Sequence, residues 1–398
     1  MPWKEASSMS LRRELVELAS GEGRNISELC ARFGVSRKTA YKWLSRHQVE
    51  GLAGLTDQSR RPRQSPERTS QRVEAAIVAL RKQHPAWGAR KLRARLVALG
   101  HKGLPAASTV HAILLRAGLV CPGESAKRQP FQRFEHPEPN DLWQMDFKGH
   151  FALTSGTRCH PLTVLDDHSR FSLTLAACGD ESSQTVRERL IGVFRRYGLP
   201  RRMLMDNGPS WRGDDGDPQS VFTVWLMRLG VRVTHGRPFH PQTQGKDERF
   251  HRTLKAEVLT RPFDTLRGCQ RAFDRWRDVY NLERPHEALG LIPPIQRYRE
   301  SQRAYPKRLP SIEYAPDDQV RKVSIQGDIS FRGHEIRLSK ALRRMLVALR
   351  PTGEDGVWDV YFSYSLLGQL DLRGPAAERH GAPTFVRCAH YGRRPMTP

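Results

Sequence analysis

Three carboxylates stand where the sequence predicts that regular elements end or begin. Asp146 lies on the polar face of the predicted strand "LWQMDFKGHFAL", Asp206 ends the apolar run "RRMLMD", and Glu248 falls in the first turns of a helix after Gly245. Carboxylate oxygens at strand ends and a helix start are suitable ligands for two hard divalent cations. Two such cations would polarise the attacking and leaving oxygens of a phosphodiester. The three residues therefore predict metal-dependent phosphoryl transfer.

Each carboxylate also has an ordinary structural interpretation. Asp206 could begin a turn stabilised by its own side chain before Gly208. Glu248 could be a surface partner of Arg252, and Asp146 could face solvent from an edge strand. An isolated carboxylate is usually a solvated surface group. Taken one at a time, the three residues leave both interpretations open.

The segments around these residues predict a mixed α/β sheet. "HPLTVLDDHSR", "FSLTLAAC", "RRMLMDNG" and "VRVTHG" follow the first strand as further strands. "SSQTVRERLIGVFRRYG" predicts a helix that stops at Gly198, and "DPQSVFTVWLMRLG" predicts one that starts near Asp217 and buries Val221. Three sequential strands followed by alternating helices and strands indicate a mixed sheet with helices on its faces. In such sheets the chemistry gathers at strand ends.

The N-terminal region has the pattern of a helix-turn-helix. "ISELCARFGVSRKTAYKWLSRH" combines a short amphipathic helix, a turn at Gly34, a helix cap at Ser36 and a second helix over 37–47. The second helix presents residues suited to phosphate contacts and groove edges, namely Arg37, Lys38, Thr39, Tyr41 and Lys42. The alternative is an ordinary pair of core helices whose basic residues form a solvated face.

Two polar, charge-rich stretches, 56–70 and 121–140, predict linkers. The segment between them is either a second helix-turn-helix or a helical spacer. Short alternating strands after residue 300 predict a small antiparallel barrel, which either stabilises the chain or holds DNA or a second subunit. The predicted domains are a helix-turn-helix domain (1–60), a second helical domain (61–125), the catalytic core (126–300) and a small β-barrel with a basic tail (301–398).

Composition makes nucleic acid the leading partner. The 398 residues carry 66 Lys and Arg against 42 Asp and Glu, a net charge of +24 that calls for an anionic counter-surface. A GC-rich genome that favours Arg explains part of this excess. No apolar run reaches membrane-spanning length, no signal peptide is evident, and the six Cys have no C-x-x-C spacing, which predicts a cytoplasmic location at the bacterial nucleoid. No nucleotide-binding G-x-x-x-x-G-K-[ST] loop occurs, so no nucleotide cofactor is expected.

Four motifs together carry a family resemblance: "LWQMDFKG", "LTVLDDHSRF", "MDNGPSW" and "HPQTQGKDERFHRTLKAE". They resemble the catalytic core of bacterial insertion-sequence transposases of the DDE type, which are related to retroviral integrases and to the ribonuclease H-like fold. "AWGARKLRARL" and "YNLERPHEALG" extend the resemblance on either side. It implies that Asp146, Asp206 and Glu248 form the catalytic, metal-binding triad, with two Mg²⁺ ions, or Mn²⁺ in their place.

The resemblance also bears on the neighbours of the triad. Asp247 precedes Glu248, but the family pattern favours Glu248, and Asp166 and Asp167 are expected to shape a turn. The acidic run 212–217 is either a second point of metal attraction or a loop. Candidate DNA contacts outside the first helix pair are Arg90, Lys91, His240, Gln242, Lys246 and Arg249. Lys246 is the strongest candidate because the family carries a basic residue there.

Two features depart from the family pattern. Pro293 stands where Thr is expected, and the zinc-binding His and Cys cluster of integrases is absent. The predicted function is a DNA transposase that recognises terminal inverted repeats, hydrolyses 3′ ends and joins them to target DNA. Because two DNA ends must be brought together, the mechanism implies at least a dimer on double-stranded DNA. The alternatives are a DNA-binding regulator with an inactive core and a nuclease that cuts without joining.

Overall fold

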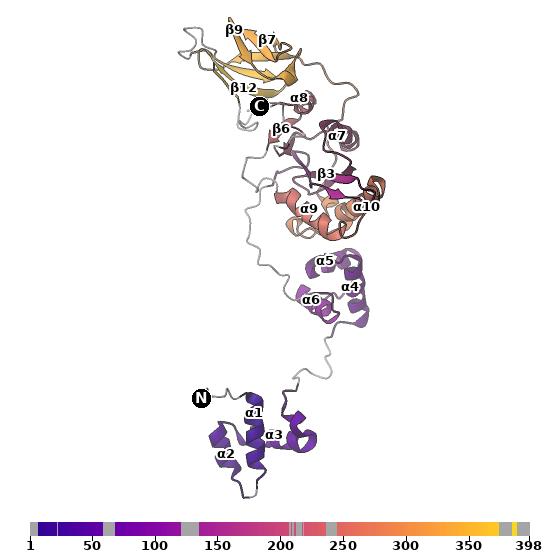
Figure 1. Ribbon diagram of the computed structural model, residues 1–398, viewed down its shortest axis with the longest axis vertical. Coiled ribbons are helices and arrows are strands. Elements are labelled where there is room, and N and C mark those ends of the chain that lie inside the picture. Colours follow the sequence, from indigo (N-terminus) through magenta and orange to yellow (C-terminus); the bar gives the residue numbers. More distant parts are fainter. Residues whose placement is uncertain are drawn as a thin grey trace. The chain divides into compact units, whose positions relative to one another are not determined.

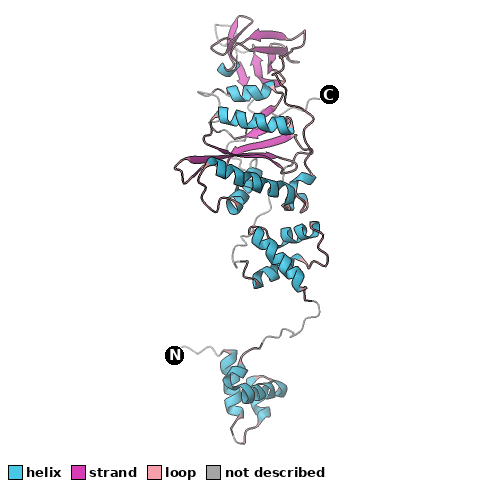
Figure 2. Ribbon diagram, turned by 90° about the vertical axis from the view of Figure 1, so that its right-hand side faces the viewer, coloured by secondary structure: helices cyan, strands magenta, loops and turns pink. Residues whose placement is uncertain are grey.

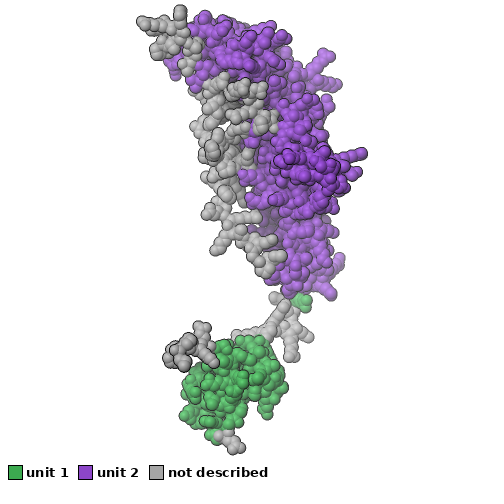
Figure 3. All heavy atoms as spheres, viewed as in Figure 1, with its two compact units in different colours: residues 1–68 green, residues 69–398 purple. Residues whose placement is uncertain are grey.

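The computed structural model describes residues 7–21, 23–58, 68–120, 135–206, 208, 211, 217, 219–235, 245–373 and 384–387. The chain separates into two compact units, Met1–Arg68 and Thr69–Pro398 (Figure 3). Each unit is described by itself below.

The first unit is a small bundle of helices. It contains α1 (Ser8–Ala19), α2 (Ile26–Phe33), α3 (Arg37–Glu50) and a short 3-10 helix, η1 (Gly51–Leu55). Gly34 ends α2 in the left-handed conformation (φ 63°), and the Ser36 side chain accepts a hydrogen bond from Thr39 N at the start of α3. Left-handed backbone favours glycine, and a serine cap satisfies a free helix N–H. The predicted helix-turn-helix is therefore confirmed.

A second helical segment opens the larger unit. It consists of α4 (Gln71–Gln83), α5 (Ala89–Ala98) and α6 (Ala107–Arg116), packed around the fully buried Trp87. Arg95 of α5 forms an ion pair with Glu283 at 2.5 Å, and Val279 packs against the same apolar cluster. This helical segment therefore contacts the sheet domain that follows it.

The central sheet is mixed, as predicted. Its strands are β1 (Leu142–Phe147), β2 (Phe151–Ala152), β3 (Arg158–Asp166), β4 (Ser172–Cys178), β5 (Arg202–Met205) and β6 (Arg232–His235). β1 pairs antiparallel with β3 and parallel with β5, β3 also pairs with β2 and β4, and β6 lies parallel to β5. Because β1 and β5 are parallel, their C-terminal ends lie next to each other at the same end of the sheet.

Helices cover both faces of this sheet (Figure 2). On one face α7 (Ser183–Tyr197) and α8 (Val221–Arg228) share an apolar cluster with Trp143 and Met145 of β1. On the other face α9 (Gly245–Glu257) and α10 (Leu266–Asp278) pack on alternate residues of β3 and β4 (Figure 1). Strand side chains alternate between faces, so Asp146, one residue after Met145, is directed to the α9 side.

Three local details differ from the sequence predictions. The first predicted strand is broken into β1 and β2 around Gly149, whose φ is 81°. Val221 is 62% exposed, because a capping box of Ser220 and Thr223 sets the start of α8 and turns Val221 outward. Gln144, placed on the polar face of the strand, is buried and donates to Asp167 at 2.7 Å.

The C-terminal region is a sheet domain. Five antiparallel strands run in the order β13 (Thr384–Arg387), β12 (Ser365–Asp371), β11 (Val357–Phe362), β10 (Leu346–Pro351) and β7 (Gln319–Lys322), and β8 (Asp328–Phe331) pairs with β9 (His334–Arg337). Val224 and Met227 of α8 belong to its apolar core. The short helices η4 (Val279–Glu283), η5 (Glu287–Leu289), η6 (Pro294–Gln296) and η7 (Lys340–Leu342) complete the described elements. No described helix is long and apolar enough to cross a membrane.

Candidate active site

Asp146 sits near the end of β1, opposite Thr163 of β3. The Thr163 hydroxyl donates to the main-chain oxygen of Asp146 at 2.9 Å, and its Oγ1 lies 2.9 Å from Nε2 of His251 on α9. Nδ1 of the same imidazole is 3.9 Å from Asp146 Oδ2. β3 therefore holds the main chain at Asp146, and α9 places the His251 ring beside its carboxylate.

Asp206 follows the last residue of β5, the parallel neighbour of β1. Its Oδ1 accepts hydrogen bonds from Gly208 N at 2.9 Å and Trp211 Nε1 at 2.6 Å. His235 of β6 donates to its main-chain oxygen at 3.0 Å. The turn predicted from Asp206 and Gly208 is present, and it fixes the carboxylate at the sheet edge next to Asp146.

Burial and neighbouring charge make Asp146 hard to ionise. Burial and, after it, the charge of Asp206 raise the pKa of Asp146 to about 7, with smaller contributions from Glu181 and Glu248. Desolvation and nearby carboxylates both disfavour the charged form of an acid. The two predicted catalytic aspartates are thus close enough for their charges to interact.

Glu248 lies exposed in the first turn of α9. Its charge reaches Asp146, but no three described His, Cys, Asp or Glu side chains are arranged to hold a metal ion. The donor set itself fits hard divalent cations, because all three predicted ligands offer carboxylate oxygens. The buried and crowded Asp146 carboxylate is also the kind of group whose ionised form a bound cation stabilises.

Asp247, the neighbour of Glu248, points inward instead. It is 1% exposed, and neither carboxylate oxygen has a hydrogen-bond partner among the described residues. Burial, followed by the charge of Asp146, raises the pKa of Asp247 well above its ordinary range. An isolated buried carboxylate is costly to ionise, so this side chain is held as the neutral acid. Glu248, which the family pattern favours as the ligand, is the exposed member of the pair, and its role as a ligand stays a prediction.

Lys246 does not project into open solvent from the start of α9. Its ammonium contacts the Asp167 carboxylate and lies 3.2 Å from the Asp167 main-chain oxygen. Although burial alone would raise the pKa of Asp167, hydrogen bonds from His136 and the charge of Lys246 hold it well below its usual range. Asp166 shapes the turn as predicted, accepting from Ser169 N at 2.8 Å, whereas Asp167 is a partner of α9.

The imidazole of His251 is neutral at pH 7. Burial and, after it, the charge of Lys148 lower its pKa to about 4. This histidine supports Asp146 and was not singled out from the sequence. Glu181, which precedes α7 and lies 2.8 Å from His160 Nδ1, was also not singled out, because its approach to Asp146 depends on how β3 pairs with β1 and β4.

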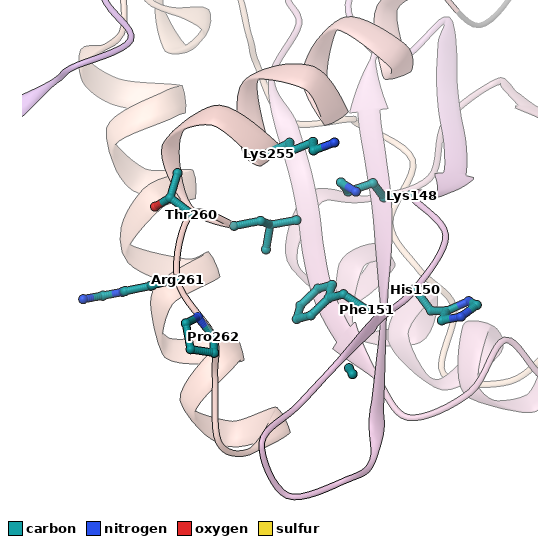
Figure 4. Close-up of a pocket in the computed structure, with 9 residues that line it drawn as sticks. Lys148, His150, Phe151, Lys255, Thr260, Arg261 and Pro262 are labelled. Carbon is teal, nitrogen blue, oxygen red and sulfur yellow. The ribbon is translucent and has the colours of Figure 1, made fainter.

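A cationic hollow of about 500 Å³ lies between the β1–β2 connection and the end of α9 (Figure 4). Lys148 and Lys255 extend toward the same space, whereas His150 and Arg261 point away from it. Burial lowers the pKa of Lys148, and the charge of Lys255 lowers it further. The two ammonium groups are therefore close enough for their charges to repel each other.

The remaining predicted DNA contacts are distributed over both units. Arg37, Lys38, Tyr41 and Lys42 are exposed on α3, while Thr39 is half-buried. Arg90 and Arg249 are exposed, and Lys91 is half-buried, with burial and the nearby Arg284 lowering its pKa to about 8. His240 and Gln242 lie outside the described residues, as does most of the acidic run 212–217.

Family comparisons agree with this arrangement. The integrase core domain matches residues 136–241 and, in a second version, residues 229–294. A helix-turn-helix domain matches residues 11–63, and a homeodomain-like domain matches residues 39–114. The C-terminal domain of the IS481 family of transposases matches residues 318–378.

Individual relatives come from insertion elements and retroviruses. The chain is 28% identical over 283 residues to an uncharacterized 39.2 kDa protein of insertion element IS476 from Xanthomonas euvesicatoria, covering 69% of this chain and 78% of that protein. It is 35% identical over 117 residues to the Gag-Pro-Pol polyprotein of squirrel monkey retrovirus, 29% of this chain and 6% of the polyprotein. A simian T-cell lymphotropic virus intasome structure is similar over 79% of this chain and 97% of that chain, with 15% identity and a TM-score of 0.35.

Fold and matches together define a protein of the transposase and integrase class, with helix-turn-helix domains before an integrase core. Within that class, residues 318–378 match the C-terminal domain of the IS481 family of transposases, and the chain is similar to proteins of insertion elements. Such domains act on DNA, in transposition or integration.

Proposed function

We propose that this protein is a DNA transposase that binds the terminal inverted repeats of its element, hydrolyses the 3′ ends and joins them to target DNA. The observation that carries this proposal is the placement of Asp146 and Asp206 at the ends of adjoining parallel strands, with Glu248 on the helix that covers the same edge. Asp146, Asp206 and Glu248 would hold two Mg²⁺ ions, or Mn²⁺ in their place.

When bound, the cations supply positive charge against the developing charge of the phosphodiester. The chain supplies orientation. The hydrogen bonds of Gly208 and Trp211 hold Asp206, and Thr163 and His251 hold the β1 end that carries Asp146. Lys148 and Lys255 add fixed positive charge for a DNA phosphate. Phosphoryl transfer depends mainly on such positioning and electrostatic stabilisation.

The relatives support the same function. Proteins from insertion elements and retroviral polyproteins share the integrase core region with this chain. Two helix-turn-helix-type matches before the core provide the means of recognising element ends. Joining two ends in one reaction further implies at least a dimer on DNA.

A strand-joining assay tests the proposal. Purified protein is given labelled element-end DNA and either Mg²⁺ or Mn²⁺, and is compared with Asp206→Asn. Asparagine keeps the Oδ1 acceptor for Gly208 and Trp211 but loses the charge, so the turn should persist. Asp141→Asn, which removes a carboxylate paired with Arg201 at 3.1 Å, is the matched control.

We expect metal-dependent nicked and joined products with the unchanged protein and the control, and neither product with Asp206→Asn, although its end binding is retained. Full activity of Asp206→Asn contradicts the triad. End binding without nicking in either metal indicates a regulator with an inactive core, and nicking without joining indicates a nuclease.

A further inference from the structure

The first turn of α9 is tied to the turn between β3 and β4 by one buried ion pair. Lys246 and Asp167 form it, with 18% and 0% of their side chains exposed. The Lys246 ammonium also approaches the Asp167 main-chain oxygen at 3.2 Å. Such a lysine is directed into the protein and not toward a phosphate backbone.

Asp167 is itself held firmly by other elements. His136 N donates to its Oδ2 at 2.9 Å, and Gln144 of β1 donates to its Oδ1 at 2.7 Å. The guanidinium of Arg170 donates to its main-chain oxygen and pairs with Glu135 at 3.3 Å. The carboxylate is therefore a fixed anchor, connected to the strand that carries Asp146.

Because Lys246 and Glu248 lie in the same helical turn, the contact that holds Lys246 also holds the main chain at Glu248. Lys246 and Glu248 are two residues apart in the same first turn, which separates them by about 3 Å along the helix axis. First-turn N–H groups lack partners within the helix, so helix ends fray unless tertiary contacts hold them. A restraint on Lys246 is thus a restraint on the position of Glu248.

We propose that the Lys246–Asp167 pair positions the first turn of α9, and with it Glu248, against Asp146 and Asp206. Lys246 is then a positioning residue and not a DNA contact. This inference rests on the proposed function for its catalytic meaning, although the anchoring itself can be measured without activity.

The two roles of Lys246 predict different results. A lysine that neutralises a phosphate contributes affinity for every DNA sequence, and its removal lowers the salt slope of binding by about 1. A positioning lysine leaves DNA affinity and its salt slope unchanged. Removing either partner of a buried ion pair leaves the other charge uncompensated, so Lys246→Met and Asp167→Asn should have similar effects.

The experiment compares Lys246→Met, Asp167→Asn, their double variant and the conservative Lys246→Arg in the full chain. Arg201→Met, which removes an exposed partner of Asp141, is the control. Three quantities are measured: hydrogen exchange of a peptide covering 245–257, binding of element-end DNA over a range of salt, and the Mg²⁺ concentration for half-maximal joining.

We expect both single variants to speed exchange at residues 249–252, whose amides bond to the carbonyl groups of the first turn of α9, at least tenfold. We also expect both to raise the half-maximal Mg²⁺ concentration at least fivefold. End-DNA affinity stays within twofold, Lys246→Arg restores part of the protection, and the double variant is no worse than the worse single variant.

A tenfold loss of DNA affinity in Lys246→Met, with a flatter salt dependence and unchanged exchange in Asp167→Asn, overturns the inference in favour of a DNA contact. If Asp167→Asn does not fold, Lys246→Met and Lys246→Arg decide the question through exchange and DNA binding. If the unchanged protein joins no ends, the proposed function fails, and the exchange measurements still show whether the pair anchors α9.

Discussion

Asp146 gives the clearest pH-dependent prediction at the scale of single residues. Its pKa is raised from 3.8 to about 7 by burial and by the charge of Asp206. Between these two values the folded protein binds more protons than the unfolded chain, so the free energy of unfolding falls as pH rises. The metal-free protein is therefore destabilised at pH 8 by the ionised Asp146.

Asp146→Asn should remove this destabilisation. In the absence of divalent metal we expect the variant to be more stable than the unchanged protein at pH 8, by on the order of 2 kcal/mol. The difference should disappear near pH 3, below the ordinary pKa of 3.8, where the carboxyl group is mostly protonated in both the folded and the unfolded state. Denaturant unfolding in a chelating buffer at several pH values measures it, and Asp141→Asn serves as the control. A difference that is the same at every pH contradicts the assignment.

The sequence predicts residue types at the site better than their surroundings. Asp206 could be located because it ends an apolar run, and Asp146 because it lies on the polar face of an alternating strand. Lys246, Asp247 and Gln144 could not be placed correctly as buried or exposed, because their burial depends on the packing of α9 against β1 and β3. Their partner Asp167 is close to them only in the folded chain.

At the scale of elements, the end of α7 depends on one glycine. Gly198 has a φ of 76°, and a Cβ there would lie 2.7 Å from Ser301 O and 2.8 Å from Arg303 O. The same stretch holds the helix end, since Ser301 N donates to Tyr197 O at 2.9 Å. The sequence predicted the stop at Gly198 but not the later segment that packs on it.

Two glycines of this region should respond in opposite ways to alanine. Gly198→Ala should destabilise the protein by at least about 2 kcal/mol, because of strain and a clash with main-chain atoms. Gly192→Ala, inside α7 at an exposed position with open space around it, should stabilise it by about 0.5–1 kcal/mol. Thermal or denaturant unfolding measures both. Equal effects of the two substitutions would contradict the assigned role of the 301–303 segment.

The hollow between β1 and α9 leads to a prediction about DNA phosphate. Lys148→Met combined with Lys255→Met should weaken end-DNA binding and lower the salt slope by about 2, because each lysine is expected to neutralise one phosphate. Titrations at several salt concentrations measure the slope. Lys307→Met, an exposed lysine away from the hollow, should not change it by more than the error. An unchanged salt slope in the double variant would show that Lys148 and Lys255 do not neutralise DNA phosphates.

At the scale of the whole molecule, affinity for DNA in general and preference for one DNA sequence have different physical sources. The net charge of +24 favours binding to any DNA, because phosphate contacts carry no sequence information. Preference for the element's own ends must come from base contacts, for which the start of a recognition helix is the usual source. Arg37 and Lys38 are exposed at the start of α3, in the unit that is separate from the integrase core.

Arg37→Gln combined with Lys38→Gln should therefore lower the preference for element-end DNA over other DNA more than it lowers the affinity for DNA in general. We expect the ratio of binding to element-end DNA over scrambled DNA of equal length to fall at least tenfold, with thermal stability unchanged because both side chains are exposed. Arg13→Gln, on α1 of the same unit, loses one positive charge and an exposed ion pair with Glu17 and should leave the ratio intact. If end and scrambled DNA lose affinity equally, Arg37 and Lys38 contact phosphates only, and the preference must then come from other residues.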